Sequence, residues 1–150
     1  MAKISNDVQM RDAINGLEAE AQRTLGARFV DGVKELTKNP DLLRAIATAR
    51  DADAPATALE AAYHTAKGIA IATYTACGHD ADWLAQAEHF VAAACAAALS
   101  PVSGGGELSP AWKAAMQARI ARTCALIEQA DDRVDHEASR QYAIVEEFLA

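Results

Sequence analysis

Aromatic and basic residues are both scarce in this chain of 150 residues, and each scarcity excludes something. Aromatic side chains make up 5% of the sequence, so the core has to be built from small aliphatic side chains on closely packed elements. The 14 lysines and arginines are outnumbered by 21 aspartates and glutamates, which gives a formal net charge of −7. This balance disfavours a nucleic-acid partner, because phosphate binding needs clustered cations.

Cysteine is also rare, and the three cysteines form no close pair. Cys77, Cys95 and Cys124 are odd in number and lack a Cys-x-x-Cys spacing, which predicts reduced thiols rather than a disulfide framework. The chain opens without an apolar leader, and apolar runs such as 91–99 are too short to cross a bilayer. We therefore expect a cytoplasmic protein that does not enter the membrane.

Alanine is what the chain has in abundance, at about a quarter of its residues. It has the highest helix propensity of any residue, and its small side chain lets helix axes approach closely. The sequence therefore predicts an all-α fold, a compact bundle of about five or six closely packed helices. Its length suits a single domain over residues 1–150.

Apolar spacing places the first two helices. A long helix is expected over residues 7–38, with a kink or break near Gly26, and Asn39-Pro40 ends it. A short second helix follows, with Leu42, Leu43 and Ile46 as its buried positions.

The third and fourth helices are expected to pack through small residues. Thr57 and Glu60 fit a capping box that opens a helix reaching about residue 76, with a small-residue face. Asp80 or Asp82 caps the next helix, which ends near Leu99. The faces predicted to be buried are Ala62, Ala66, Ala70 and Thr73 on the third helix, and Leu84, Ala87, Val91, Ala94 and Ala98 on the fourth.

A glycine-rich loop over residues 100–108 separates these helices from the C-terminal part. Ser109-Pro110 then predicts an N-cap followed by proline at the first helical position. The pattern does not decide whether one helix or two follow, because Asp131-Asp132 interrupts an otherwise continuous phase. The apolar face expected at the start of this part is Trp112, Met116, Ile120, Cys124 and Ile127.

The densest group of reactive side chains lies between the third and fourth helices. Cys77, His79, Asp80 and Trp83 bring a thiol, an imidazole, a carboxylate and an indole together at a helix junction. One interpretation is purely structural, because junctions collect caps and glycines. The other is a ligand pocket around Cys77, which a metal ion or a tetrapyrrole would occupy; for the metal, His89 and Cys95 are further candidate ligands.

Two segments resemble those of a known family. The residues from Tyr74 to Asp80 are similar to the bilin-attachment segment of the phycobiliproteins, and those from Glu107 to Trp112 are similar to the start of a late helix there. The resemblance implies a globin-like helical fold that binds a bilin or haem. Cys77 would then carry the chromophore, and Asp80 would bind its pyrrole nitrogens, although His79 stands where the family has arginine.

Protein–protein binding without catalysis is the function that the sequence favours. The chain has no phosphate-binding loop and no complete catalytic constellation, and no di-iron pattern is present. An acidic helical bundle of this size suits an inhibitor of a basic protein, as immunity proteins are, or a homo-oligomer. The alternative is the tetrapyrrole or metal site around Cys77.

Overall fold

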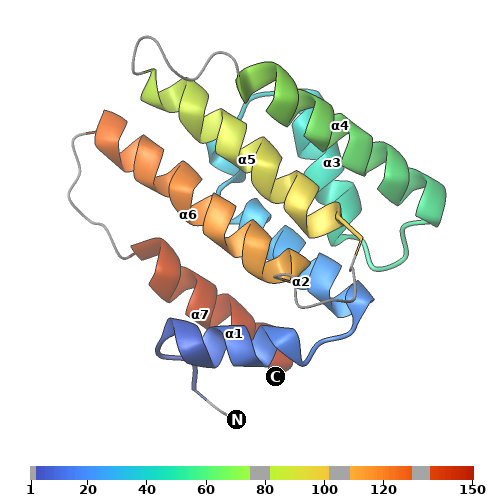
Figure 1. Ribbon diagram of the computed structural model, residues 1–150, viewed down its shortest axis with the longest axis vertical. Coiled ribbons are helices and arrows are strands. Elements are labelled where there is room, and N and C mark those ends of the chain that lie inside the picture. Colours follow the sequence, from blue (N-terminus) through green and yellow to red (C-terminus); the bar gives the residue numbers. More distant parts are fainter. Residues whose placement is uncertain (1–2, 75–81, 102–108, 130–135) are drawn as a thin grey trace.

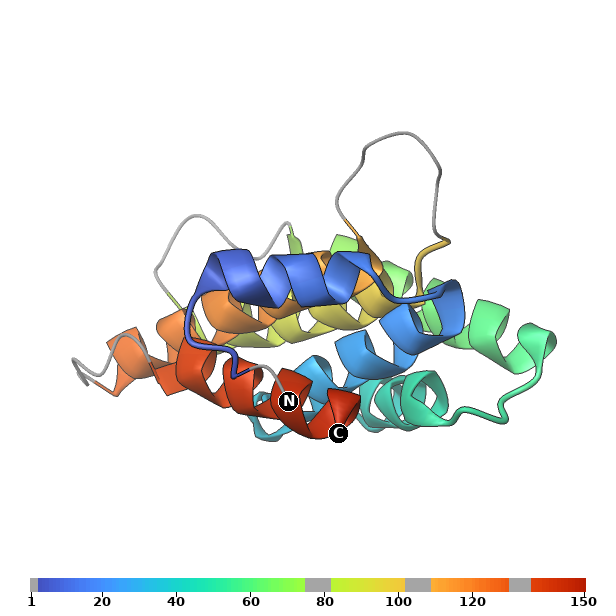
Figure 2. The ribbon, with the colours of Figure 1, turned by 90° about the horizontal axis from the view of Figure 1, so that it is seen from below.

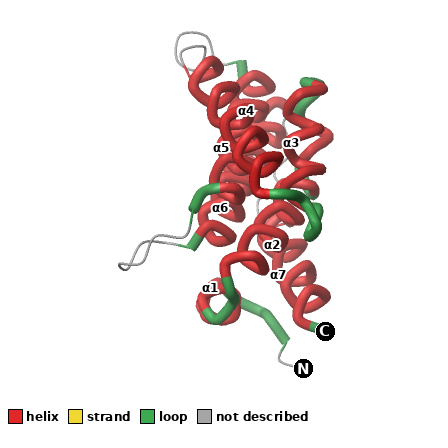
Figure 3. The backbone as a smooth tube through the Cα atoms, turned by 90° about the vertical axis from the view of Figure 1, so that its right-hand side faces the viewer, coloured by secondary structure: helices red, strands yellow, loops and turns green. Residues whose placement is uncertain are grey.

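The computed structural model describes residues 3–74, 82–101, 109–129 and 136–150. Within these ranges the chain forms seven α-helices, one short 3-10 helix and no strand (Figure 3). This confirms the all-α class and corrects the expected number of helices. The elements are α1 (Asp7–Asn15), α2 (Ala19–Asp31), η1 (Lys34–Leu36), α3 (Pro40–Arg50), α4 (Ala56–Tyr74), α5 (Trp83–Leu99), α6 (Pro110–Glu128) and α7 (His136–Leu149).

The helices pack in two layers. α4, α5 and α6 lie side by side, with α5 between its two neighbours, and α2 and α3 lie behind them (Figure 1). α1 and α7 pack together at the edge beyond α6 (Figures 1 and 2). No helix in the described part of the chain has both the length and the hydropathy of a membrane span. This arrangement makes α5 the most enclosed helix and leaves the outer side of α4 open.

The contact between α5 and α6 is built almost entirely from alanine. We call Ala94 and Ala98 of α5, with Ala114, Ala118 and Ala121 of α6, the alanine seam; all five belong to one buried cluster. Each is at most 1% exposed. Methyl groups facing methyl groups allow the two helices to approach closely, as the composition predicts.

Gly26 belongs to this close packing and does not kink a helix. It lies inside α2 and is buried, where a Cβ atom would be 3.1 Å from the Ala98 Cβ and 3.3 Å from the Ala111 Cα. The predicted kink at this residue is therefore wrong. A glycine in a helix interior usually weakens it, but here the missing side chain lets α2 contact α5 and α6 together.

The predicted single helix over residues 7–38 is wrong because tertiary polar contacts end it twice. After α1, the Ile14 carbonyl accepts hydrogen bonds from the Gly16 amide and from the buried side chain of Gln22. After α2, the Gly32 carbonyl accepts from Arg122 and Arg140, each at 3.1 Å. Partners distant in sequence thus satisfy carbonyls that a continuing helix would have bonded.

The local capping signals gave mixed results. Asp82 and Ser109 are confirmed as N-caps: their side chains accept from the amides of Ala85 at 3.0 Å and Trp112 at 3.3 Å. The capping box at Thr57 is wrong, since α4 already begins at Ala56 and the Leu59 amide bonds the Pro55 carbonyl. Proline before the helix moves its start one residue upstream of the predicted cap.

Large side chains proved a poor guide to the buried faces of α5 and α6. Leu84, Ile120 and Ile127 were expected inside but are 52%, 40% and 46% exposed, and Leu43 of α3 is also exposed. Small residues take the inner positions because the short spacing between these helices has no room for branched chains. The small-residue face of α4 is confirmed in part: Ala62 and Ala66 are buried, whereas Ala70 and Thr73 are half-buried.

The C-terminal part forms two helices, which answers the question that the sequence leaves open. α6 ends at Glu128 and α7 begins at His136, while Asp131 and Asp132 lie outside the described residues. Buried Gln141 of α7 joins the pair: its amide donates to the Ala115 carbonyl at 2.9 Å, and its oxygen accepts from Arg119 at 2.8 Å.

A bidentate ion pair fastens α1 to this corner. Both Asp7 carboxylate oxygens accept from Arg119, at 2.8 and 3.0 Å, and the Tyr142 hydroxyl donates to the same group at 2.7 Å. The hydrogen bonds from Arg119 hold the pKa of Asp7 below its usual value; burial opposes them, and the bond from Tyr142 assists.

We expect this contact to make the fold sensitive to acid. A carboxyl whose pKa is lower in the folded state contributes stability above the unfolded pKa of about 4 and loses it as the pH falls. The Asp7→Asn variant should therefore lose less stability than the wild type between about pH 4 and pH 2, by under about 1 kcal/mol because Asp7 is half-exposed. Urea unfolding across this range measures the difference. Asp12→Asn on the same helix should follow the wild type, and equal curves for all three proteins would contradict the expectation.

A second, more deeply buried charge cluster joins α2, η1, α6 and α7. Arg122 donates to Glu137 at 3.0 Å and forms an ion pair with Glu35, while Arg140 lies 3.5 Å from Glu137. The Glu137 side chain is 4% exposed, and its second oxygen is buried without a hydrogen-bond partner among the described residues. Burial alone would lower the pKa of Arg122, but the bonds to Glu35 and Glu137 outweigh it and raise that pKa.

Candidate functional site

The predicted site falls largely outside the described part of the chain. Cys77, His79 and Asp80 lie within residues 75–81, so the geometry of a pocket around Cys77 is not tested. The described residues that border it are Tyr74 at the end of α4 and Asp82 and Trp83 at the start of α5.

Trp83, the one predicted site residue inside the described ranges, has a packing role. Its half-buried ring lies against a small cluster formed by Ala87, Cys124 and Ala125, where the start of α5 meets the end of α6. An indole in such a position fills the space between two helix ends.

His89 is a polar residue whose position the sequence did not reveal. An exposed imidazole was expected from its neighbours, but His89 is buried, and its Nδ1 is 2.9 Å from the Thr73 hydroxyl of α4. The imidazole also contacts the rings of Tyr74 and Phe90. The prediction was wrong because the partner, Thr73, comes from another helix, and only the antiparallel packing of α4 on α5 brings the two together. This pair holds the end of α4 in place.

The described thiols are buried within the helix packing. Burial raises the pKa of Cys95 to about 12, so this thiol stays protonated at neutral pH and is a poor nucleophile and metal ligand. Among the described residues, no group of three or more histidines, cysteines or carboxylates is placed to hold a metal ion. Glu60 and His64 form an exposed pair one helical turn apart, as the spacing predicts.

A polar pocket of about 640 Å³ lies between η1, the start of α5 and the end of α6. Its carboxylates are committed to the packing: Glu35 pairs with Arg122, and Glu88 accepts from the Thr37 hydroxyl at 3.0 Å. Asp82, also in the lining, caps α5. These charges therefore hold the three elements together, and they do not converge on a common reaction centre.

The outer side of α4 is the most unusual surface of the described chain. Ala61, Thr65, Gly68 and Ile71 recur at steps of three and four, and all of them are exposed. Ile71 is 63% exposed, and Tyr74, one turn further, is 70% exposed. No charged residue occurs between Gly68 and Tyr74. We call this strip of Ala61, Thr65, Gly68, Ile71 and Tyr74 the α4 face.

A shallow groove of about 520 Å³ runs beside the α4 face, between α3 and α4. Its floor is made largely of alanine methyl groups, and the ion pair of Asp41 with Arg44 stands at one edge. Ala61 and Thr65 belong both to the groove and to the α4 face, so the two features form one continuous surface.

Comparison with known proteins adds no assignment to this site. No protein-family model, curated protein or solved structure matches the chain.

Proposed function

We propose that this protein acts by binding another protein chain through the α4 face and the groove beside it. The observation that carries the proposal is the exposure of Ile71 and Tyr74 on an uncharged length of helix. Large apolar side chains gathered on one surface are typical of interaction sites, whereas single scattered ones are ordinary.

The shape of this surface suits a helix or loop of a partner. Gly68 has open space around it, and the neighbouring small residues would let a partner's backbone come close to α4. The alanine-floored groove is deep enough for a bulky apolar side chain, and Tyr74 supplies a rigid aromatic contact of the kind that dominates binding energies.

The charge of the chain favours a basic partner. A net charge of −7 leaves the apolar α4 face on an acidic protein, an arrangement that steers a basic protein toward it and discourages close approach of a second acidic copy at low salt. An inhibitor or immunity-like role fits this chemistry, with self-association through the same face as the other form of the proposal.

The test is to place charge on the α4 face. In the Ile71→Glu/Tyr74→Glu variant we expect capture of the host partner to fall at least about tenfold, since each buried charge would be unpaired in the interface. Pull-down from the host with quantitative mass spectrometry measures heterologous binding, and sedimentation velocity measures self-association. Thermal unfolding should be nearly unchanged, because both side chains are already exposed.

Val8→Glu is the matched control, since Val8 is an apolar residue on α1 that is 70% exposed, as Tyr74 is. It should bind as the wild type does. Binding that falls equally in the control and in the α4 variant would reflect added negative charge alone, and binding that falls in neither would exclude the α4 face.

A further inference from the structure

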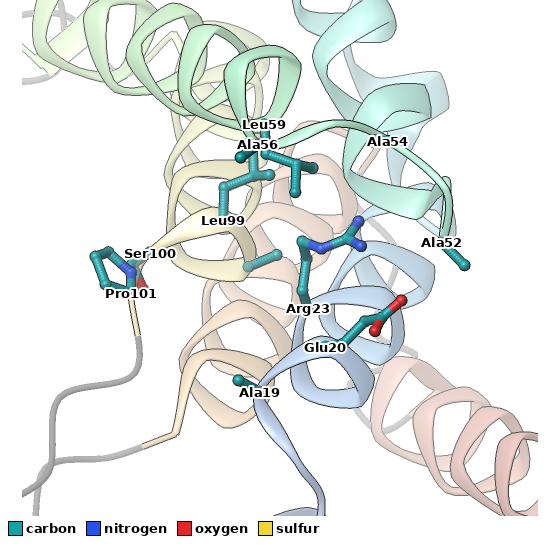
Figure 4. A pocket seen from close by; sticks show the side chains of 11 residues that line it. Ala19, Glu20, Arg23, Ala52, Ala54, Ala56, Leu59, Leu99, Ser100 and Pro101 are labelled. Atoms are coloured by element: carbon teal, nitrogen blue, oxygen red, sulfur yellow. The ribbon is translucent and has the colours of Figure 1, made fainter.

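A second hollow of different chemistry lies at the opposite end of α4. It has a volume of about 430 Å³ and is enclosed by the starts of α2 and α4, the end of α5 and the connection from α3 to α4 (Figure 4). Its walls are mainly apolar: Leu59 and Leu99 extend toward its centre, and alanines contribute most of the rest.

Arg23 brings a positive charge into this apolar hollow from α2 (Figure 4). One nitrogen of its guanidinium, Nη1, donates to the Ala49 carbonyl at 2.6 Å and to the Asp51 carbonyl at 3.0 Å. These two bonds fix the plane of the group against the end of α3, and the donors on Nε and Nη2 remain for another acceptor. Among the described residues, no carboxylate forms an ion pair with Arg23.

The surrounding backbone adds to the positive potential. α2 begins at Ala19 without a side-chain cap, and α4 begins at Ala56 after Pro55, whose side chain has no acceptor. Both helix starts line the hollow, so their unbonded amides and the positive ends of two helix dipoles lie near Arg23. Glu20 is the opposing charge, but it is exposed at the rim, where water screens it more than it screens the half-buried guanidinium.

From this geometry we infer a ligand site, separate from the α4 face, for a small monocarboxylate with a short apolar chain. The carboxylate would accept the two remaining donors of Arg23, which form the fork that suits a carboxylate. The chain would lie between Leu59, Leu99 and the alanine methyl groups. The volume admits a body of about six carbons, within the range of small-molecule pockets.

Hexanoate is the probe, and hexanamide, which has the same length and no charge, is its neutral match. In amide ¹H–¹⁵N spectra of the full chain, hexanoate should shift Ala19, Arg23, Ala56, Leu59 and Leu99 with a dissociation constant on the order of 1 mM. Hexanamide should bind at least about tenfold more weakly, because a charge-assisted hydrogen bond would be lost.

Arg23→Gln should lose at least about tenfold in hexanoate affinity, whereas Arg44→Gln, an equal change of charge on exposed α3, should retain it. Equal affinities for hexanoate and hexanamide, or shifts confined to other residues, would overturn the inference, as would no binding at concentrations of about 20 mM, well above the expected constant. The comparison of the two probes on the unchanged protein decides the matter even where Arg23→Gln fails to fold.

Discussion

Adding one methyl group at Gly26 is expected to destabilise the protein by about 1–3 kcal/mol, and adding three, in Gly26→Val, to prevent folding. A Cβ atom at this position would contact Ala98 of α5 and both Ala111 and Ala114 of α6, all at 3.4 Å or less. Relief toward one helix would press α2 against the other. The gain of about 1 kcal/mol that alanine normally brings to a helix interior is therefore exceeded by overpacking.

Gly68→Ala is the matched control, because Gly68 also lies inside a helix but has no atom within 4 Å of where its Cβ would be. This variant should be more stable than the wild type by about 0.5–1 kcal/mol. Urea unfolding of both variants measures the opposite signs. Stabilisation by Gly26→Ala would show that α2 does not approach α5 and α6 as closely as described.

Removing the charge of Arg122 is the second change with a large expected effect. In Arg122→Met, Glu137 would stay buried with only Arg140, at 3.5 Å, as a cationic neighbour, and the Gly32 carbonyl would lose one of its two donors. An uncompensated buried carboxylate costs about 3–5 kcal/mol, so the variant should unfold at a much lower urea concentration.

Adding Glu137→Gln to Arg122→Met should restore much of the lost stability, because the double variant no longer buries an unpaired charge. Arg44→Met, which breaks an exposed pair with Asp41, should cost less than about 0.5 kcal/mol. A double variant no more stable than Arg122→Met alone would show that Arg122 acts through packing and not through its pairing with Glu137.

Signals that act within a few residues predicted this fold well. Asp82 and Ser109 cap their helices because a short polar side chain next to the first turn needs no distant partner. The same is true of Asn39, which precedes Pro40 and caps α3. Helix content followed from alanine alone, since propensity is a local property.

Features that depend on a partner from elsewhere in the chain were missed. The breaks after α1 and α2 rely on Gln22, Arg122 and Arg140, whose targets are backbone carbonyls that no sequence pattern marks. The buried faces of α5 and α6 were assigned by looking for large apolar residues, but short distances between helices reverse that preference. Ile120 consequently lies outside while Ala118 lies inside.

The candidate site divides along the same line. Reactive residue types pointed to Cys77, and the described ranges reach only its border at Trp83, which is a packing residue. The α4 face was foreseen only in general terms, as alanine-lined surface beyond what one core can bury. Placing it on Ile71 and Tyr74 required knowing that α4 has neighbours on one side alone.

The alanine seam also bears on how this protein can evolve. Nearly every codon change at Ala94 or Ala118 introduces a bulkier residue, so selection should hold these sites almost fixed, with serine and glycine as the tolerated alternatives. The outward positions of the same helices can vary freely, Ile120 among them. Divergent descendants of this chain would then share a pattern of invariant small residues at intervals of three and four, and that pattern would identify them where overall identity has faded.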